Sequence, residues 1–325
     1  EVINSLSGLK DLKSLDQAVI GCDKLNNLKG LEGAPNITKL NLISKELEDI
    51  SNIKSLTKLT NLDLSECSSI ESLSGLEKLN LLESLKVTDC SKLKSLDGAP
   101  KSDVYVLNKR YRSGVEVNLS GCSSLEDISA LKGASKIDWF DIEGCTSIRT
   151  TEGLEKIEID YLGCSESDIS LLQSLNNLDV KTLSLREMKT TSFEGLNEWP
   201  SVKTLRIHSA SFQNLLGIDV FVNTTLLGLN NDSSQGPDCN TLKNLTGIES
   251  LKYLEELDLT GCDELQDVNA LSELTNLAKL NMDECPNVEP LPRPKVMESR
   301  EKVEKYQIRL LKALGKDIPK ASKKE

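Results

Sequence analysis

Hydrophobic residues along this chain recur in a short phrase of the form L-x-L, which returns at a nearly constant step of about 22 residues. The two apolar side chains of the phrase lie two positions apart, so both point to the same side of a short strand. Further apolar residues then follow at every third position, as at Ile70, Leu73 and Leu76. Side chains at i and i+3 eclipse in a 3₁₀ turn. The pattern therefore predicts, in each repeat, a strand followed by a return path of 3₁₀ and extended pieces.

The phrase recurs along almost the whole chain, up to about residue 290. Its members are Ala18/Ile20, Leu40/Leu42, Leu62/Leu64, Leu85/Val87, Val117/Leu119, Phe140/Ile142, Ile159/Tyr161, Leu183/Leu185, Leu205/Ile207, Leu227/Leu229, Leu257/Leu259 and Leu280/Met282, of which Ala18/Ile20 and Ile159/Tyr161 are less regular. A single repeat cannot bury its apolar side alone, so we expect about twelve repeats to stack around a continuous core.

Cysteines occupy a fixed place in this pattern. Six of them follow the second apolar residue of a phrase by three positions: Cys67, Cys90, Cys122, Cys145, Cys262 and Cys285. Cys22, Cys164 and Cys239 lie at nearly the same place. The pattern resembles the consensus L-x-x-L-x-L-x-x-N/C-x-L of leucine-rich repeats, in the SDS22-like subclass that is shared with bacterial internalins. The resemblance implies an α/β repeat solenoid, a curved horseshoe with a parallel sheet on its concave face and a mostly 3₁₀ or extended convex side.

The cysteines are best explained as structural thiols. Stacked repeats would place them about 4.8 Å apart, in a column of buried side chains that act as small apolar groups with a weak S–H donor toward a loop carbonyl. Disulfides between neighbouring repeats are permitted by distance, but side chains in a ladder run parallel and do not meet with the required dihedral angle. No C-x-x-C pair occurs and His208 is the sole histidine, so we expect neither a metal site nor a Cys–His nucleophile.

The repeats end near four prolines, and residues 291–325 differ in character from the solenoid predicted for residues 1–290. From about Lys295 to Leu314 the sequence predicts an amphipathic helix with Val303, Tyr306 and Leu310 on one stripe. We expect this helix to cover the core of the last repeat, and a docking helix for a partner is the alternative. At the other end the chain opens inside the three-residue rhythm and without Met. We therefore expect that residues upstream of Glu1 were trimmed or removed with a leader.

Charge and motifs exclude several functions. The net charge is −12, whereas a nucleic-acid-binding face is basic. The chain has no apolar run of membrane-spanning length, no phosphate-binding glycine loop and no G-x-S-x-G motif. We expect no catalysis, no cofactor, no nucleic-acid partner and no membrane insertion. Free ladder thiols favour a reducing, intracellular compartment, with secretion or the cell surface left open.

Two regions stand out as candidate binding sites for a protein partner. Trp139 should point outward by strand parity, near acidic residues and, two to three rungs on, basic ones: Asp141, Glu143, Glu158, Asp160, Arg186, Arg206 and His208. An exposed tryptophan among arginines and acids has the composition of a binding hot spot. Alternatively, Trp139 folds back over a neighbouring rung and shields it.

The second region is an insertion at residues 100–114, whose aromatic and basic residues are Tyr105, Lys109, Arg110, Tyr111 and Arg112. Tyrosine and arginine are enriched at interfaces, but a tolerated surface loop is the alternative, since extra loop length costs little. We expect a monomeric, non-catalytic scaffold that binds a protein on its concave face and this loop. Two alternatives are a surface adhesin of internalin type and an SDS22-like regulatory subunit of a phosphatase or cytoskeletal adaptor.

Overall fold

The computed structural model describes residues 6–99, 116–132, 134, 136–165, 169–188, 190–208, 211–229 and 241–318. The chain divides into two compact units. The first unit comprises Glu1–Ser165 with Asn177–Val180, and the second comprises Glu166–Asn176 with Lys181–Glu325. The five residues of the basic insertion and Cys239 lie outside the described residues.

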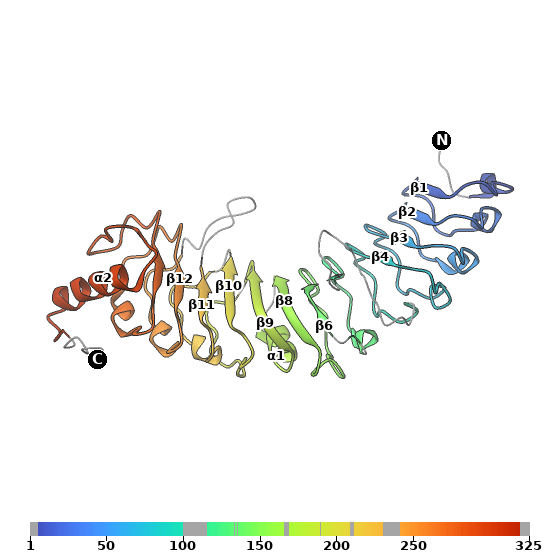
Figure 1. Cartoon of the computed structure of the whole chain (residues 1–325). Helices are drawn as coiled ribbons and strands as arrows, with labels where there is room; N and C mark the ends of the chain where they lie inside the picture. The colour runs from blue at the N-terminus through green and yellow to red at the C-terminus, as the bar shows by residue number, and fades with distance from the viewer. Residues whose placement is uncertain are drawn as a thin grey trace. The chain divides into compact units, whose positions relative to one another are not determined.

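Short parallel strands form the first unit, and Figure 1 shows the first four of them side by side. Their bounds are β1 (Gln17–Gly21), β2 (Lys39–Ile43), β3 (Asn61–Asp63), β4 (Ser84–Lys86), β5 (Glu116–Asn118), β6 (Lys136–Ile137), β7 (Trp139–Asp141) and β8 (Glu158–Ser165). The register pairs Leu40 with Leu62 and Leu62 with Leu85. One repeat along the sequence is therefore one step from a strand to its neighbour in the sheet.

The second unit repeats this arrangement. Its strands are β9 (Asp179–Arg186, which belongs to this unit from Lys181 on), β10 (Thr204–His208), β11 (Leu226–Gly228), β12 (Glu256–Asp258), β13 (Lys279–Asn281) and β14 (Val296–Met297). Those from β9 to β13 pair in parallel, and β14 is antiparallel to β13.

The return paths contain 3₁₀ turns, as the three-residue spacing predicts. They are η1 (Ser7–Leu9), η2 (Leu31–Gly33), η3 (Ser51–Ser55), η4 (Ser129–Leu131), η5 (Ile218–Val220), η6 (Ile248–Ser250) and η7 (Asn269–Glu273). One return path instead carries a short α-helix, α1 (Ile169–Leu175). Leucines from the strands and from these turns fill the core, and most of them are fully buried. At about 1.5–3 kcal/mol for each large apolar side chain, this interior is the main source of stability.

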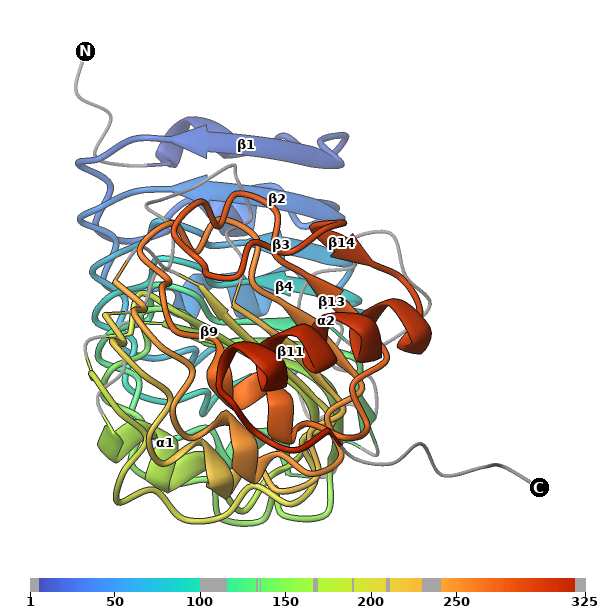
Figure 2. The same cartoon turned by 90° about the vertical axis from the view of Figure 1, so that its left-hand side faces the viewer.

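A C-terminal helix, α2 (Arg300–Ala313), lies against the last repeat of the second unit (Figure 2). It begins later than the sequence predicts, because β14 and a short turn precede it. Val303, Tyr306 and Leu310 are buried, as the predicted stripe requires. The Tyr306 hydroxyl donates to the carbonyl of Pro290 at 2.9 Å. Burial raises the pKa of Tyr306 to about 12.

The strand alternation in β8 differs from the prediction. The register pairs Phe140 with Leu162 and Asp141 with Gly163, so Leu162 and Cys164 are the inward pair, and Ile159/Tyr161 is wrong. Ile159 also points inward, and Asp160 and Tyr161 then both face outward. Asp138 and Trp139 interrupt the alternation in the same way between Ile137 and Phe140, and the pairing keeps one offset throughout, so β8 carries no extra residue relative to its neighbour. Cys164 consequently lies within the strand rather than at the ladder position. The same interruption turns Tyr161 outward beside Trp139.

Candidate functional site

In each unit, the outward side chains of the strands form a surface that we call the strand face of that unit. Its central position in each strand, the x of L-x-L, is often Asp or Asn, and these side chains have a structural task. The Asp141 carboxylate accepts a hydrogen bond from the Glu143 backbone N–H at 3.1 Å. The same contact to the residue two positions on recurs at Asp63, Asn118, Asp258 and Asn281. These are Asx turns, so repetition of the turn accounts for the acidic residue at this position.

An aromatic pair is the most distinctive feature of the strand face in the first unit. The rings of Trp139 and Tyr161 stack with centroids 3.7 Å apart and planes 11° from parallel. Both side chains are half-buried. Trp139 thus contacts the next rung, and part of its indole stays accessible. Tyr161 follows Trp139 by one repeat, so the sequence could have identified it, had the inward pair of β8 been assigned correctly.

Gly163 has no side chain, and the ring of Tyr161 occupies the space that a side chain there would fill. A Cβ atom at Gly163 would lie 3.2 Å from ring atom Cε1 and 3.5 Å from the hydroxyl of Tyr161, and 3.5 Å from Oδ1 of Asp141. The ring of Tyr161 therefore leans over the bare backbone of Gly163, beside the Asp141 carboxylate. A larger residue at position 163 would displace the ring.

Lys136, which the sequence did not identify as a candidate, contacts three acidic residues near this pair. The Lys136 ammonium lies 2.6 Å from Oδ2 of Asp160, 3.4 Å from Oδ1 of Asp138 and 3.7 Å from Oε1 of Glu158. These contacts, chiefly the hydrogen bond to Asp160, raise the pKa of Lys136 above its usual value. Lys136 is therefore charged, and Glu158 and Asp160 contact it rather than standing alone.

The basic residues predicted near Trp139 on the strands all lie in the second unit. Arg186 of β9 stands directly opposite His208 of β10 in the register, and Arg206 is opposite Ser184. The structure therefore places the predicted acids with Trp139 in the first unit and the predicted strand-borne cations Arg186, Arg206 and His208 in the second. Within the second unit, Arg206 is exposed.

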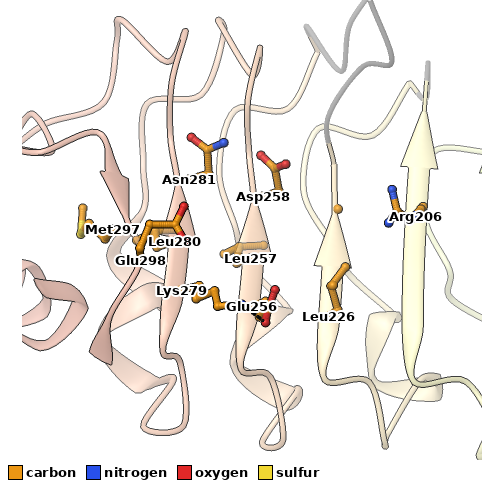
Figure 3. A pocket seen from close by; sticks show the side chains of 11 residues that line it. Arg206, Leu226, Glu256, Leu257, Asp258, Lys279, Leu280, Asn281, Met297 and Glu298 are labelled. Atoms are coloured by element: carbon orange, nitrogen blue, oxygen red, sulfur yellow. Dashed lines mark hydrogen bonds and ion pairs between the residues drawn. The ribbon is translucent and has the colours of Figure 1, made fainter. Parts of the chain in front are cut away.

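A hollow of about 230 Å³ opens on the strand face of the second unit. It exists because glycine occupies the central position of β11, where Gly228 stands between Arg206 of β10 and Asp258 of β12 in the register. Figure 3 shows Arg206 and Asp258 on either side of β11, and Glu256 beside Lys279. The Lys279 ammonium lies 2.6 Å from Oε1 of Glu256. The hollow is thus flanked by both signs of charge.

The described residues contain no group of three or more His, Cys, Asp or Glu side chains that could hold a metal ion. In the same part of the chain no helix is long and apolar enough to cross a membrane.

The cysteine ladder is structural in its geometry, as the sequence predicts. Each thiol donates to the carbonyl of the second inward residue in the preceding repeat; the acceptors of Cys67, Cys90, Cys122, Cys145, Cys262 and Cys285 are Leu42, Leu64, Val87, Leu119, Leu229 and Leu259, at 3.0–3.6 Å. All of these thiols are buried, and the cysteines that the structure describes form no disulfide. Burial raises the pKa of Cys67 and of Cys285 to about 11. The ladder is therefore not a reactive site at neutral pH.

Inward leucines of successive repeats are paired in the strand register. Cysteine thiols donate hydrogen bonds to the preceding repeat. These two features establish the architecture. The chain has a leucine-rich repeat fold. In this leucine-rich repeat solenoid the core and the turns are fixed by the repeat itself, so residues that depart from it, such as Trp139 and Tyr161, are the candidates for function.

No protein-family model and no curated protein matches the chain. Among solved structures, an internalin (inlF) from Listeria monocytogenes is similar over 86% of this chain and 86% of its own, with 18% identity and a TM-score of 0.40. A leucine-rich repeat protein of Leptospira interrogans is similar over 94% of this chain and 90% of its own, with 16% identity and a TM-score of 0.35.

A third structure is the functional domain of InlJ from Listeria monocytogenes, described as including a cysteine ladder. It is similar over 81% of this chain and 61% of its own, with 16% identity and a TM-score of 0.34. At these identities the likeness concerns the fold alone, and the function below is derived from this chain's own residues.

Proposed function

We propose that this chain is a non-catalytic scaffold that recognises a protein partner through the strand face of its first unit. The stacked rings of Trp139 and Tyr161 carry the proposal. The inward side of this sheet is filled by leucine, and an aromatic pair on its outward side contributes nothing to that core. Aromatic residues supply large contact area at interfaces and dominate their binding energy.

The surroundings of the rings support a binding role. Asp141, Glu158 and Asp160 are half-buried around the pair, which matches the polar rim that surrounds the aromatic anchors of protein interfaces. The side chains at the outward positions of β8 are also held in place, since Tyr161 rests on Gly163 and Asp160 on Lys136. A site with fixed side chains loses less conformational entropy when a partner binds.

A capture experiment with three baits tests this function. Wild-type chain, the double variant Trp139→Ala/Tyr161→Ala and the control Tyr253→Ala are immobilised, and the proteins that each retains from a cell extract are compared by mass spectrometry. Tyr253 is 59% exposed on a return path of the second unit, so its removal takes an exposed aromatic ring without touching the pair. We expect at least one protein to be retained by wild type and Tyr253→Ala and lost by the double variant.

Thermal melts of the three baits show whether the substitutions leave the fold intact. If all three baits with equal melting temperatures retain the same proteins, the strand face of the first unit is not the recognition site. The basic insertion at residues 100–114 remains a second proposed contact on the basis of its sequence. Charge reversal of Lys109, Arg110 and Arg112 to glutamate, applied to the same retained protein, tests that contact separately.

A further inference from the structure

The strand face of β5 to β8 carries an excess of negative charge. Along these strands the structure describes one lysine, Lys136, with the carboxylates of Glu116, Asp138, Asp141, Glu158 and Asp160. Beside them, Glu143 follows β7 and the exposed Lys156 precedes β8, so the acids still outnumber the lysines. Lys136 contacts three of the acids, so one positive charge faces several negative ones. The side chains of Asp138, Glu158 and Asp160 are 35%, 41% and 35% exposed. Partly desolvated charges are screened less than fully exposed ones.

The aromatic pair lies inside this negative field. In the register, Glu116 of β5 is opposite Trp139, and Asp141 is next to Gly163, on which Tyr161 rests. The faces of indole and phenol rings carry negative potential and attract cations. Ring faces and carboxylates therefore favour the same kind of ligand at the same place.

We propose that the segment of the partner seated on this face is basic, with an arginine or lysine side chain against the Trp139–Tyr161 pair and its charge among the surrounding carboxylates. This inference rests on the proposed function and names the chemistry of its partner. An acidic segment would be repelled by the same carboxylates. An apolar segment would strip water from Asp141 and Glu158 without supplying an opposite charge, which is costly.

Arginine fits the geometry better than lysine. Its planar guanidinium can lie on a ring face and still donate two parallel hydrogen bonds to one carboxylate. A lysine ammonium is a more strongly hydrated point charge and cannot make both contacts in this way. We therefore expect arginine-containing ligands to bind more tightly than lysine-containing ligands of equal charge.

The test uses the full chain and short acetylated, amidated peptides in which glycine alternates with arginine, lysine or glutamate. Binding is followed by tryptophan fluorescence. The chain has two tryptophans, and Trp199 is fully buried, so a change on titration reports on Trp139. A Trp139→Phe variant gives the background of Trp199 alone.

We expect the arginine peptide to change the fluorescence of wild-type chain, with weaker binding of the lysine peptide and none of the glutamate peptide. The double variant Glu158→Gln/Asp160→Asn should bind the arginine peptide about tenfold more weakly, because the attraction between its guanidinium groups and two partly desolvated carboxylates is lost. The matched control Asp263→Asn/Glu264→Gln removes the same charge from exposed positions of the second unit and should leave binding unchanged. Raising the salt concentration should weaken binding.

Two results would overturn the inference. One is equal binding of arginine and glutamate peptides. The other is equal loss of the arginine peptide in Glu158→Gln/Asp160→Asn and in the control, since attraction would then come from net charge alone. The capture experiment separates this failure from that of the proposed function. If the Trp139→Ala/Tyr161→Ala bait loses a retained protein while the arginine peptide does not bind, the recognition site stands and its basic ligand is wrong.

Discussion

Replacing Cys145 by alanine removes one fully buried sulfur and one of the links between repeats. The Sγ atom of Cys145 donates to the Leu119 carbonyl at 3.0 Å, and the same carbonyl accepts the Cys122 backbone N–H at 3.1 Å. Because this acceptor keeps one of its two bonds, the substitution does not leave it unpaired. Losing the weak S–H bond costs roughly 0.5 kcal/mol at the low end for a hydrogen bond. Lost transfer energy and a small cavity add about 1–2 kcal/mol.

We therefore expect Cys145→Ala to lower the free energy of unfolding by about 2 kcal/mol, and Cys145→Asp by about 3–5 kcal/mol, since it buries a carboxyl group without a partner. The matched control is Cys22, which holds the corresponding place near the start of the chain but is only partly buried. Both Cys22→Ala and Cys22→Asp should cost less than about 1 kcal/mol.

The assay is urea unfolding under reducing conditions, followed by far-ultraviolet circular dichroism, with the slope on denaturant compared between variants. Repeat arrays can unfold in more than one step, and a changed slope would reveal it. Stability of Cys145→Asp within about 0.5 kcal/mol of wild type would show that this thiol is exposed, and the ladder geometry would then be wrong.

Three further outcomes follow from the same structure. Burial raises the pKa of Cys67 from 9.0 to about 11, so as pH rises the thiol loses its proton in the unfolded chain before it does so in the folded chain. The free energy of unfolding should therefore fall between about pH 9 and pH 11, by up to about 1.4 kcal/mol per pH unit for each such thiol. Urea midpoints of a Cys67→Ala variant should fall less steeply over this range. Gly247→Ala should lower the free energy of unfolding by at least about 3 kcal/mol in the same assay, because its new Cβ would lie 2.3 Å from a backbone oxygen of the neighbouring repeat. The control Gly195→Ala, also at positive φ but with nothing within 4 Å of the new Cβ, should lower it by about 1–2 kcal/mol. Equal losses in the two variants would contradict the close approach at Gly247. Tyr306→Phe should lower the free energy of unfolding by about 1 kcal/mol, because its hydrogen bond is lost. Tyr306→Ala should lower it by about 3–5 kcal/mol, because packing is lost as well; thermal melting measures both. An unchanged melting temperature of Tyr306→Ala would mean that α2 does not cover the last repeat.

The repeat itself was predictable because its physical constraints are local and periodic. Pairs such as Leu62/Leu64 and Leu85/Val87 must point inward, and their spacing therefore gives the strand register that the structure confirms. The ladder position of Cys90 follows from the same periodicity, and its thiol does donate to the carbonyl of Leu64.

The candidate site was less predictable because it departs from that period. Strict alternation placed Tyr161 in the core, whereas two consecutive outward residues in β8 bring it against Trp139. The contact of Lys136 with Asp160 depends on the rotamers of side chains on neighbouring strands, which the sequence pattern does not specify. The role of Asp141 in an Asx turn also competes with its interpretation as a purely functional acid.

Hydroxyl-radical footprinting of the chain with and without a captured protein tests the recognition surface most directly. Radicals oxidise accessible aromatic side chains, and mass spectrometry measures each site separately. We predict that the captured protein slows the oxidation of Trp139 and Tyr161 and leaves Tyr253 unchanged. Unchanged oxidation of Trp139 and Tyr161 in a saturated complex would contradict the assignment of the strand face as the recognition surface.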